Sequence, residues 1–98
     1  MKIRKIKERL TENTDKYWRE LVRKRNNVSE LRRKGAKAVP ELARVLKEEN
    51  DVMTRLNAVD VLAEIRGRKA VEQLLIASRD PNEMVRLRAI DILQQKSK

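Results

Sequence analysis

The sequence predicts an all-α fold in which helical hairpins stack side by side as an α-solenoid. Its composition is helix-like, because aromatic residues are 2% of the chain, Phe is absent, and only two Gly and two Pro occur in 98 residues. The phrase "GAKAVPEL" at Gly35 recurs as "GRKAVEQL" at Gly67, 32 positions later. Apolar residues in and after both phrases follow the period of an amphipathic helix. One such hairpin cannot bury its own apolar stripe, so we expect about three stacked hairpins with five to seven helices.

Residues 1–34 form the least regular part of the predicted stack. A short first helix is indicated by apolar residues on one helical face: Ile3, Ile6 and Leu10. A second helix, "DKYWRELVRKR", is expected to begin at Thr14 or Asp15. The sequence "NVSE" then resembles a capping box, so two alternatives stay open here: a predicted helix break at Asn26–Asn27, or one helix over residues 15–34. Because the repeated glycine and the Ala-Val pair are missing here, we interpret 1–34 as a degenerate, basic N-terminal unit.

Residues 35–66 form the first full repeat. "AKAVPELARVLKEEN" and "DVMTRLNAVDVLAEIRG" each place their apolar residues on one helical stripe. Asp51 is the expected N-cap of the second helix, and Gly67 is expected at its C′ position.

Residues 67–95 form the second full repeat. "AVEQLLIAS" predicts its first helix. Asp80 is the expected N-cap of the next helix, with Pro81 at the first helical position and Glu83 completing a capping box. The second helices of the two repeats share R-x-x-A-[VI]-D-[VI]-L, beginning at Arg55 and Arg86, which are 31 positions apart.

G-x-x-A-V-P-x-L in a first helix, followed by D-x-x-x-x-V-R-x-x-A-x-x-x-L in a second, resembles the HEAT repeat, and within it the phycobilisome-lyase HEAT-like subclass. The chain departs from this pattern at Thr54 and Glu72. The resemblance implies a right-handed solenoid whose second helices line a concave face. It also implies structural, inter-repeat roles for the residues that recur in the second helices: Arg55, Arg86, Asp60 and Asp91.

Positive charge is concentrated in the first half of the chain. The net charge is +10, and residues 1–47 contain 16 Lys and Arg against 6 Asp and Glu. If 15–34 were one helix, four cations would share a face and form a basic ridge: Lys16, Arg19, Arg23 and Lys34. The candidate residues for binding phosphates or an acidic partner are Lys16, Arg19, Arg23, Arg25, Arg32, Arg33, Lys34 and Lys37. The alternative is a solvated face of a charge-rich, thermophilic protein.

The two aromatic residues lie next to these cations in sequence. Tyr17 and Trp18 could stack on nucleic-acid bases. The competing interpretation is that at least one of them plugs the open end of the solenoid, since the chain has no other aromatic residue.

The sequence has no Cys and no His, which removes disulfides, common zinc sites and the usual nucleophile and general-base chemistry. Its two glycines both begin repeats, so no glycine-rich phosphate loop is present. We therefore expect a non-enzymatic protein with no catalytic residues, metal or cofactor. No apolar run approaches the roughly 20 residues of a membrane span, so a cytoplasmic protein is expected.

Two functions fit these features. The first is a protein-interaction module that binds a partner, expected to be acidic, through its second-helix face and its ends. The second is a nucleic-acid-binding module that uses the basic N-terminal half against phosphates. The apolar flanks of the last repeat also predict a homodimer, or a partner, at that end.

Overall fold

The computed structural model describes the backbone of residues 2–98 and the side chains of residues 14–98. Every regular element in this part of the chain is helical: α1 (Lys2–Glu30), the 3-10 helix η1 (Leu31–Ala38), α2 (Val39–Glu48), α3 (Val52–Glu64), α4 (Arg68–Ala77) and α5 (Glu83–Lys96). The predicted all-α class is confirmed. The expected first-helix stripe of Ile3, Ile6 and Leu10 lies outside the described side chains.

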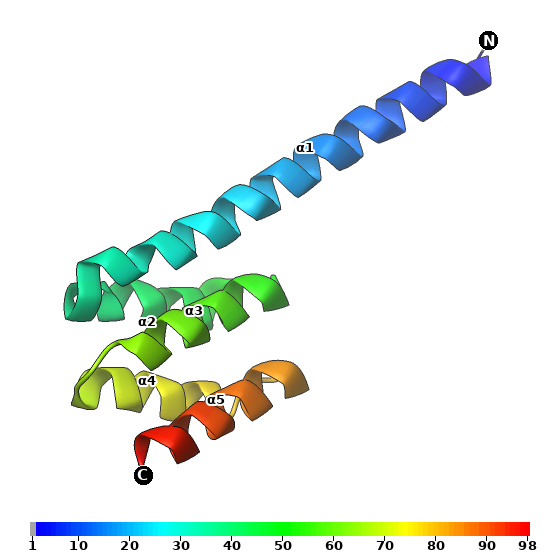
Figure 1. The fold of residues 1–98 in the computed structure, drawn as a ribbon. Coiled ribbons are helices and arrows are strands. Elements are labelled where there is room, and N and C mark those ends of the chain that lie inside the picture. The colour runs from blue at the N-terminus through cyan, green and yellow to red at the C-terminus, as the bar shows by residue number, and fades with distance from the viewer. Residues whose placement is uncertain (1) are drawn as a thin grey trace.

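The helices form two layers. Helices α1, α3 and α5 pack on one another in that order, while α2 and α4 pack together in the second layer behind them (Figure 1). Thus α2–α3 and α4–α5 are consecutive hairpins, and α1 takes the place of a second helix in the unit before them. The predicted solenoid of stacked hairpins is confirmed.

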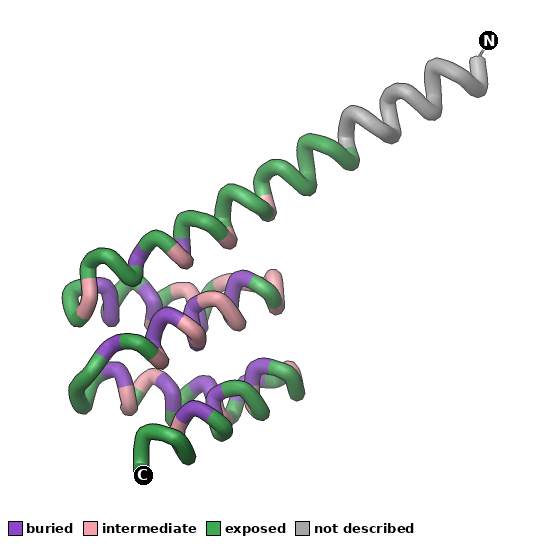
Figure 2. The backbone as a smooth tube through the Cα atoms, viewed as in Figure 1, coloured by how far each residue is buried: buried purple, intermediate pink, exposed green. Residues whose placement is uncertain are grey.

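The core lies between the layers and between the stacked hairpins. Buried positions lie mostly where helices face one another (Figure 2). The largest apolar side chains that are fully buried come from four helices: Leu42, Val59, Val61, Leu62, Leu74 and Val85. Each leucine removed from water in this way contributes about 2 kcal/mol to stability relative to an exposed one. The hairpins therefore provide one another with the apolar contact that a single hairpin lacks.

The repeated glycines have a backbone reason. Gly35 has φ 58° and ψ −136°, and it turns the chain inside η1 between α1 and α2. Gly67 has φ 111° and ψ 165° directly before α4. Residues with a side chain rarely adopt either conformation because of steric clashes, whereas glycine adopts both without steric cost. The predicted C′ position of Gly67 is wrong, because α3 already ends at Glu64 and Gly67 is instead the N-cap residue of α4.

Helix α1 is continuous through residues 26 and 27, so the predicted break there is wrong, as is a separate helix beginning at Thr14 or Asp15. The physical reason is packing after the expected break. Val28, near the end of α1, and Leu31, at the start of η1, are both buried, and these two elements both pack against α3. Tertiary burial of this kind outweighs the modest stabilisation of a local capping box.

The second helices of the two hairpins, α3 and α5, differ in the residue that caps their N-terminus. Asp51 caps α3 as predicted, since its Oδ2 accepts a hydrogen bond from the Thr54 N–H at 3.0 Å. The predicted Asp80 cap is wrong. Asn82 caps α5 by accepting from the N–H groups of Met84 at 2.9 Å and Val85 at 3.3 Å. α5 begins at Glu83 itself, so Glu83 does not complete the predicted capping box.

Candidate functional site

Two arginines join consecutive units through paired hydrogen bonds to a carboxylate. Arg25 of α1 donates from Nε and Nη2 to Asp51, at 2.9 and 3.1 Å. Arg55 of α3 donates from the same two atoms to Asp80, at 3.0 and 3.1 Å. Both carboxylates lie just before the next second helix, so each arginine fixes the turn of the following hairpin. Two parallel N–H···O bonds give this contact both strength and a fixed geometry.

The Arg25–Asp51 pair changes the acidity of both partners. The pKa of Asp51 is lowered to about 2, mainly because Arg25 hydrogen-bonds to the carboxylate and also because Thr54 donates to it. The same hydrogen bond raises the pKa of Arg25. Thr54 contributes twice, through its backbone N–H and through its hydroxyl at 2.6 Å. Asp51 is therefore both a helix cap and the acceptor for the preceding unit.

Of the other three residues assigned inter-repeat roles from the sequence, only Asp60 forms a hydrogen bond to a neighbouring unit among the described side chains. Its Oδ1 accepts from Nε of Arg88, on α5, at 2.8 Å. Asp91 accepts from Gln95 of its own helix at 3.3 Å. Arg86 donates from Nη1 to the carbonyl oxygens of Asp80 and Pro81, in the turn of its own hairpin.

Half of the eight predicted binding cations already have acidic partners. Arg25 is held by Asp51, as described above. The other three form exposed ion pairs: Arg32 with Glu64 at 3.7 Å, Arg33 with Glu30 at 3.1 Å, and Lys34 with Glu41 at 3.7 Å. Arg32, Arg33 and Lys34 all lie in η1, whereas their acidic partners come from α3, α1 and α2. Lys37, in η1, is exposed.

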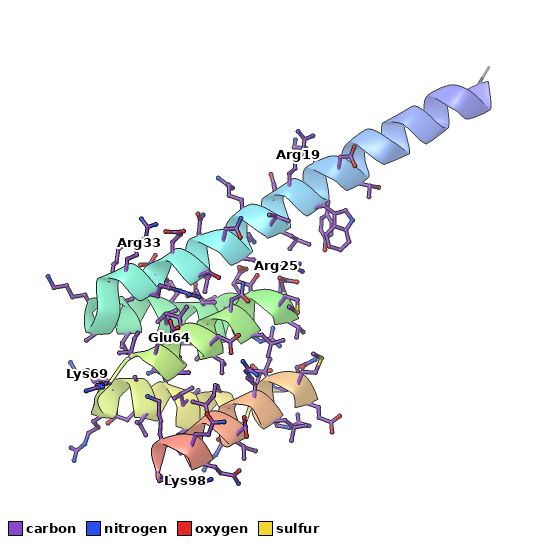
Figure 3. All side chains as sticks on the ribbon, in the orientation of Figure 1. Arg19, Arg25, Arg33, Glu64, Lys69 and Lys98 are labelled. Atoms are coloured by element: carbon purple, nitrogen blue, oxygen red, sulfur yellow. The ribbon has the colours of Figure 1, made fainter. Side chains whose placement is uncertain are left out.

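Three exposed cations remain together on α1: Lys16, Arg19 and Arg23, hereafter the basic stripe. At 100° per residue they share the face opposite Arg25. Figure 3 shows Arg19 and Arg33 directed away from the other helices, whereas Arg25 lies between α1 and α3. The prediction that Lys34 continues this face of one helix is wrong, because Lys34 lies in η1, after α1 has ended.

The two aromatic side chains are exposed, with Tyr17 at 62% and Trp18 at 51% of their full accessibility. The expected plug at the end of the solenoid is therefore wrong. Their rings meet edge to face with centroids 6.0 Å apart. The guanidinium carbon of Arg25 also lies 6.0 Å from the Trp18 ring centroid. Trp18 therefore lies on the surface of α1, beside an arginine that is already bound by Asp51.

A groove of about 570 Å³ lies between α3 and α5, on the layer formed by the second helices. Its lining consists of four pairs of repeat-equivalent residues, 31 positions apart: Met53 and Met84, Leu56 and Leu87, Asn57 and Arg88, and Asp60 and Asp91. We call it the second-helix groove. Sequence reasoning expected binding on this face but did not identify these residues. The 31-residue offset between Arg55 and Arg86 could have located them.

The apolar part of the second-helix groove is open to solvent. Met53, Met84 and Leu87 are all exposed, although large apolar side chains usually lie inside a folded protein. Methionine is flexible and polarizable, which suits it to contact with differently shaped apolar surfaces. The groove can therefore receive apolar side chains, with Asp60, Arg88 and Asp91 providing polar contacts beside them.

Other kinds of site find little support within the described residues. No group of three or more His, Cys, Asp or Glu side chains in residues 14–98 is arranged to hold a metal ion. None of the described helices is long and apolar enough to cross a membrane.

The family comparison agrees with this architecture. A model of the family described as HEAT repeats matches residues 3–94, which includes α1 as well as both hairpins. No curated protein and no solved structure shows significant similarity to the chain. The family match covers nearly all of the sequence, and its stacked helical hairpins are the units seen in the fold. The chain belongs to the HEAT-repeat family.

Proposed function

We propose that the chain is a non-catalytic interaction module that binds a protein partner through its second-helix groove and its ends. Proteins of this family generally serve as scaffolds for protein–protein contacts. The observation that carries the proposal is the groove itself, in which exposed Met53, Met84 and Leu87 lie beside Asp60 and Arg88. Exposed apolar residues with a polar rim are characteristic of surfaces that become covered by a protein.

An acidic partner fits the charge distribution. The basic stripe is free of acidic side-chain partners among the described residues, and the N-terminal half carries the excess positive charge. A partner that places apolar side chains in the groove and acidic side chains near α1 would satisfy both surfaces. Complementary charge would mainly accelerate association and select the partner, while the apolar contacts would supply most of the affinity.

Affinity capture from the native lysate, with and without nuclease, tests this proposal. Met84→Glu with Leu87→Glu places two charges in the groove without altering a buried residue. Ala36→Glu with Gln94→Glu adds the same charge at exposed positions outside the groove. We expect a nuclease-resistant partner to be lost with the groove variant and retained with the control. Equal capture by both variants would contradict binding through the groove.

Nucleic-acid binding is the alternative function, and two features of α1 favour it: the basic stripe, and the exposed rings of Tyr17 and Trp18, although Trp18 lies on the Arg25 side of the helix and not beside the stripe. Cations on one helical face can follow a phosphate backbone, and aromatic rings can stack on unpaired bases. A gel-shift titration with duplex and single-stranded DNA and RNA at two salt concentrations separates the two functions. Binding that weakens steeply with salt supports the alternative, and no shift at low salt excludes it.

Three finer assignments belong to the same proposal. The G-x-x-A-V-P-x-L and V-R motifs support membership of the phycobilisome-lyase HEAT-like subclass. The division into a degenerate N-terminal unit (1–34) and repeats 35–66 and 67–95 is supported by α1, which lacks the paired first helix of the later units. The exposed end of the last repeat has two candidate occupants, a second copy of the chain or a different partner, and light scattering that shows a monomer at high concentration would exclude the second copy.

A further inference from the structure

Three arginines, one each on α1, α3 and α5, differ in the acceptors that they bind. Arg25 and Arg55 each bind a carboxylate of the following unit. Arg86 binds no carboxylate among the side chains of residues 14–98. The outer side of the α4–α5 hairpin therefore carries an arginine whose usual acceptor is missing from the described chain.

The Arg86 guanidinium is nevertheless held as Arg55 is held. Nη1 of Arg55 donates to the carbonyl oxygens six and five residues before it, at 2.8 and 3.1 Å. Nη1 of Arg86 donates to the carbonyl oxygens six and five residues before it, at 3.0 and 2.9 Å. These bonds fix the plane of the guanidinium in the same relation to its hairpin. Nε and Nη2 of Arg86 are consequently directed toward a position that is equivalent, one unit further on, to the position of the Asp80 carboxylate relative to Arg55.

Two apolar residues of the α4–α5 hairpin are more exposed than their equivalents in the hairpin before it. Val59 lies in α3, on which α4 and α5 pack, and is 0% exposed, whereas its equivalent Ile90 in α5 is 39% exposed. Leu75 of α4 is exposed, although its equivalent Ala43 in α2 is half-buried. We call Arg86 and Ile90, which lie four residues apart on one side of α5, the stacking face.

We propose that the stacking face binds a helical hairpin that carries an Asp or Glu in the turn before its second helix and that is not supplied by a second copy of residues 1–98. That carboxylate would accept both free N–H groups of Arg86, as Asp80 does from Arg55. The two carboxylates of this chain that have the required position are already used, Asp51 by Arg25 and Asp80 by Arg55. A second copy therefore has no free acceptor of this kind, and a two-fold contact would bring two Arg86 side chains together.

The carboxylate specificity is tested by adding the missing unit to the chain. A copy of residues 67–98 is joined directly after Ser97, so that its glycine takes the place of Lys98 and its own Asp80 lies opposite Arg86. Two substitutions are made singly and together: Arg86→Gln in the original α5, and Asp80→Asn in the added copy. Arg66→Gln in the original chain is the exposed control. We expect coupling of roughly tenfold in the unfolding equilibrium constant between the first two substitutions and none with the control. Additive effects would overturn the proposal.

Binding between separate proteins is tested with the 98-residue chain. Capture from lysate is compared for the wild type, Arg86→Gln, Arg86→Lys and Arg66→Gln, with cross-linking to locate the contact. We expect a partner cross-linked beside α5 to be lost with Arg86→Gln, weakened with Arg86→Lys and retained with Arg66→Gln. Capture that is independent of Arg86, or cross-links between copies of this chain, would overturn it. The proposal extends the interaction function but does not depend on the second-helix groove. The two are told apart because the groove is tested by Met84→Glu with Leu87→Glu, and the stacking face by Arg86→Gln.

Discussion

The guanidinium of Arg55 and the carboxylate of Asp80 form two parallel hydrogen bonds across the junction of the two hairpins, Nε to Oδ1 at 3.0 Å and Nη2 to Oδ2 at 3.1 Å. Both side chains are buried. Asp80 also accepts from the backbone N–H of Asn82 at 2.8 Å, so the pair fixes the turn that starts α5. The relative position of α3 and α5, and hence the second-helix groove between them, depends on this contact.

The stability of the protein should fall in acid through Asp51. Its pKa is about 2 in the folded chain, against about 4 in an unfolded one. A lowered pKa means that the folded state binds the proton less tightly, so the stabilisation is complete above about pH 4 and is lost as the pH falls toward 2. Urea denaturation between pH 5 and 2 measures it. Asp51→Asn keeps a capping side chain but cannot titrate, so its stability should depend less on pH. Identical pH profiles would contradict the assigned pair.

Gly35→Ala should destabilise the fold by about 1–3 kcal/mol, because φ 58° with ψ −136° is a conformation that L-residues avoid. An added Cβ meets no atom within 4 Å, so the cost comes from the backbone and not from a clash. D-alanine, introduced at position 35 by chemical ligation, favours the mirror-image region and should restore the stability. Chemical denaturation of the three proteins decides this. Equal stability of the L- and D-alanine forms would refute the backbone explanation.

A proline at residue 27 tests the continuity of α1. Asn27→Pro removes a helical hydrogen bond and places the ring against the preceding turn, which costs about 3 kcal/mol inside a helix. Asn27 is exposed, so no side-chain burial is lost. We expect lower helicity by circular dichroism and lower stability, while the matched change Asn27→Ala leaves both nearly unchanged. A tolerated proline would indicate that the chain breaks at Asn26–Asn27 after all.

The basic stripe should dominate attraction to polyanions. Neutralising it with Lys16→Gln, Arg19→Gln and Arg23→Gln removes three cations that have no acidic partner among the described side chains. The matched variant Arg32→Gln, Arg33→Gln and Lys34→Gln removes three cations that already have acidic partners. We expect the stripe variant to elute from a heparin column at clearly lower salt than the matched variant. Elution of both variants at the same salt concentration would contradict this prediction, because the ion pairs would then not weaken the attraction of their cations to heparin.

The repeated units could be predicted from the sequence because their signals are local. Gly35 and Gly67 mark positive φ angles, and the apolar spacing that follows each of them gives helices α2 to α5. The N-terminal helix could not be predicted as one element. The capping-box pattern at Asn27 is genuine locally, but burial of Val28 and Leu31 against other helices overrides it.

The candidate site was less predictable, because charge partners come from distant parts of the chain. Asp80 looks like a helix cap in sequence, yet it accepts a buried arginine from 25 residues away. Arg25 looks like a free cation, yet it is bound by Asp51, 26 residues away. The inter-repeat role of Arg55 was expected from the family resemblance, although its acceptor was not. The repeat-equivalent pairs of the second-helix groove could also have been found from the sequence, by applying the 31-residue offset to every position of α3.

A double-mutant cycle on Arg55→Gln and Asp80→Asn tests most directly whether arginine–carboxylate pairs hold the stacked hairpins together. Each single variant should lose about 3 kcal/mol of unfolding free energy, since it leaves a buried charged or polar partner unsatisfied. The double variant should lose about 2 kcal/mol less than the sum of the two. Losses that add within about 0.5 kcal/mol would contradict the account, because the two side chains would then contribute independently.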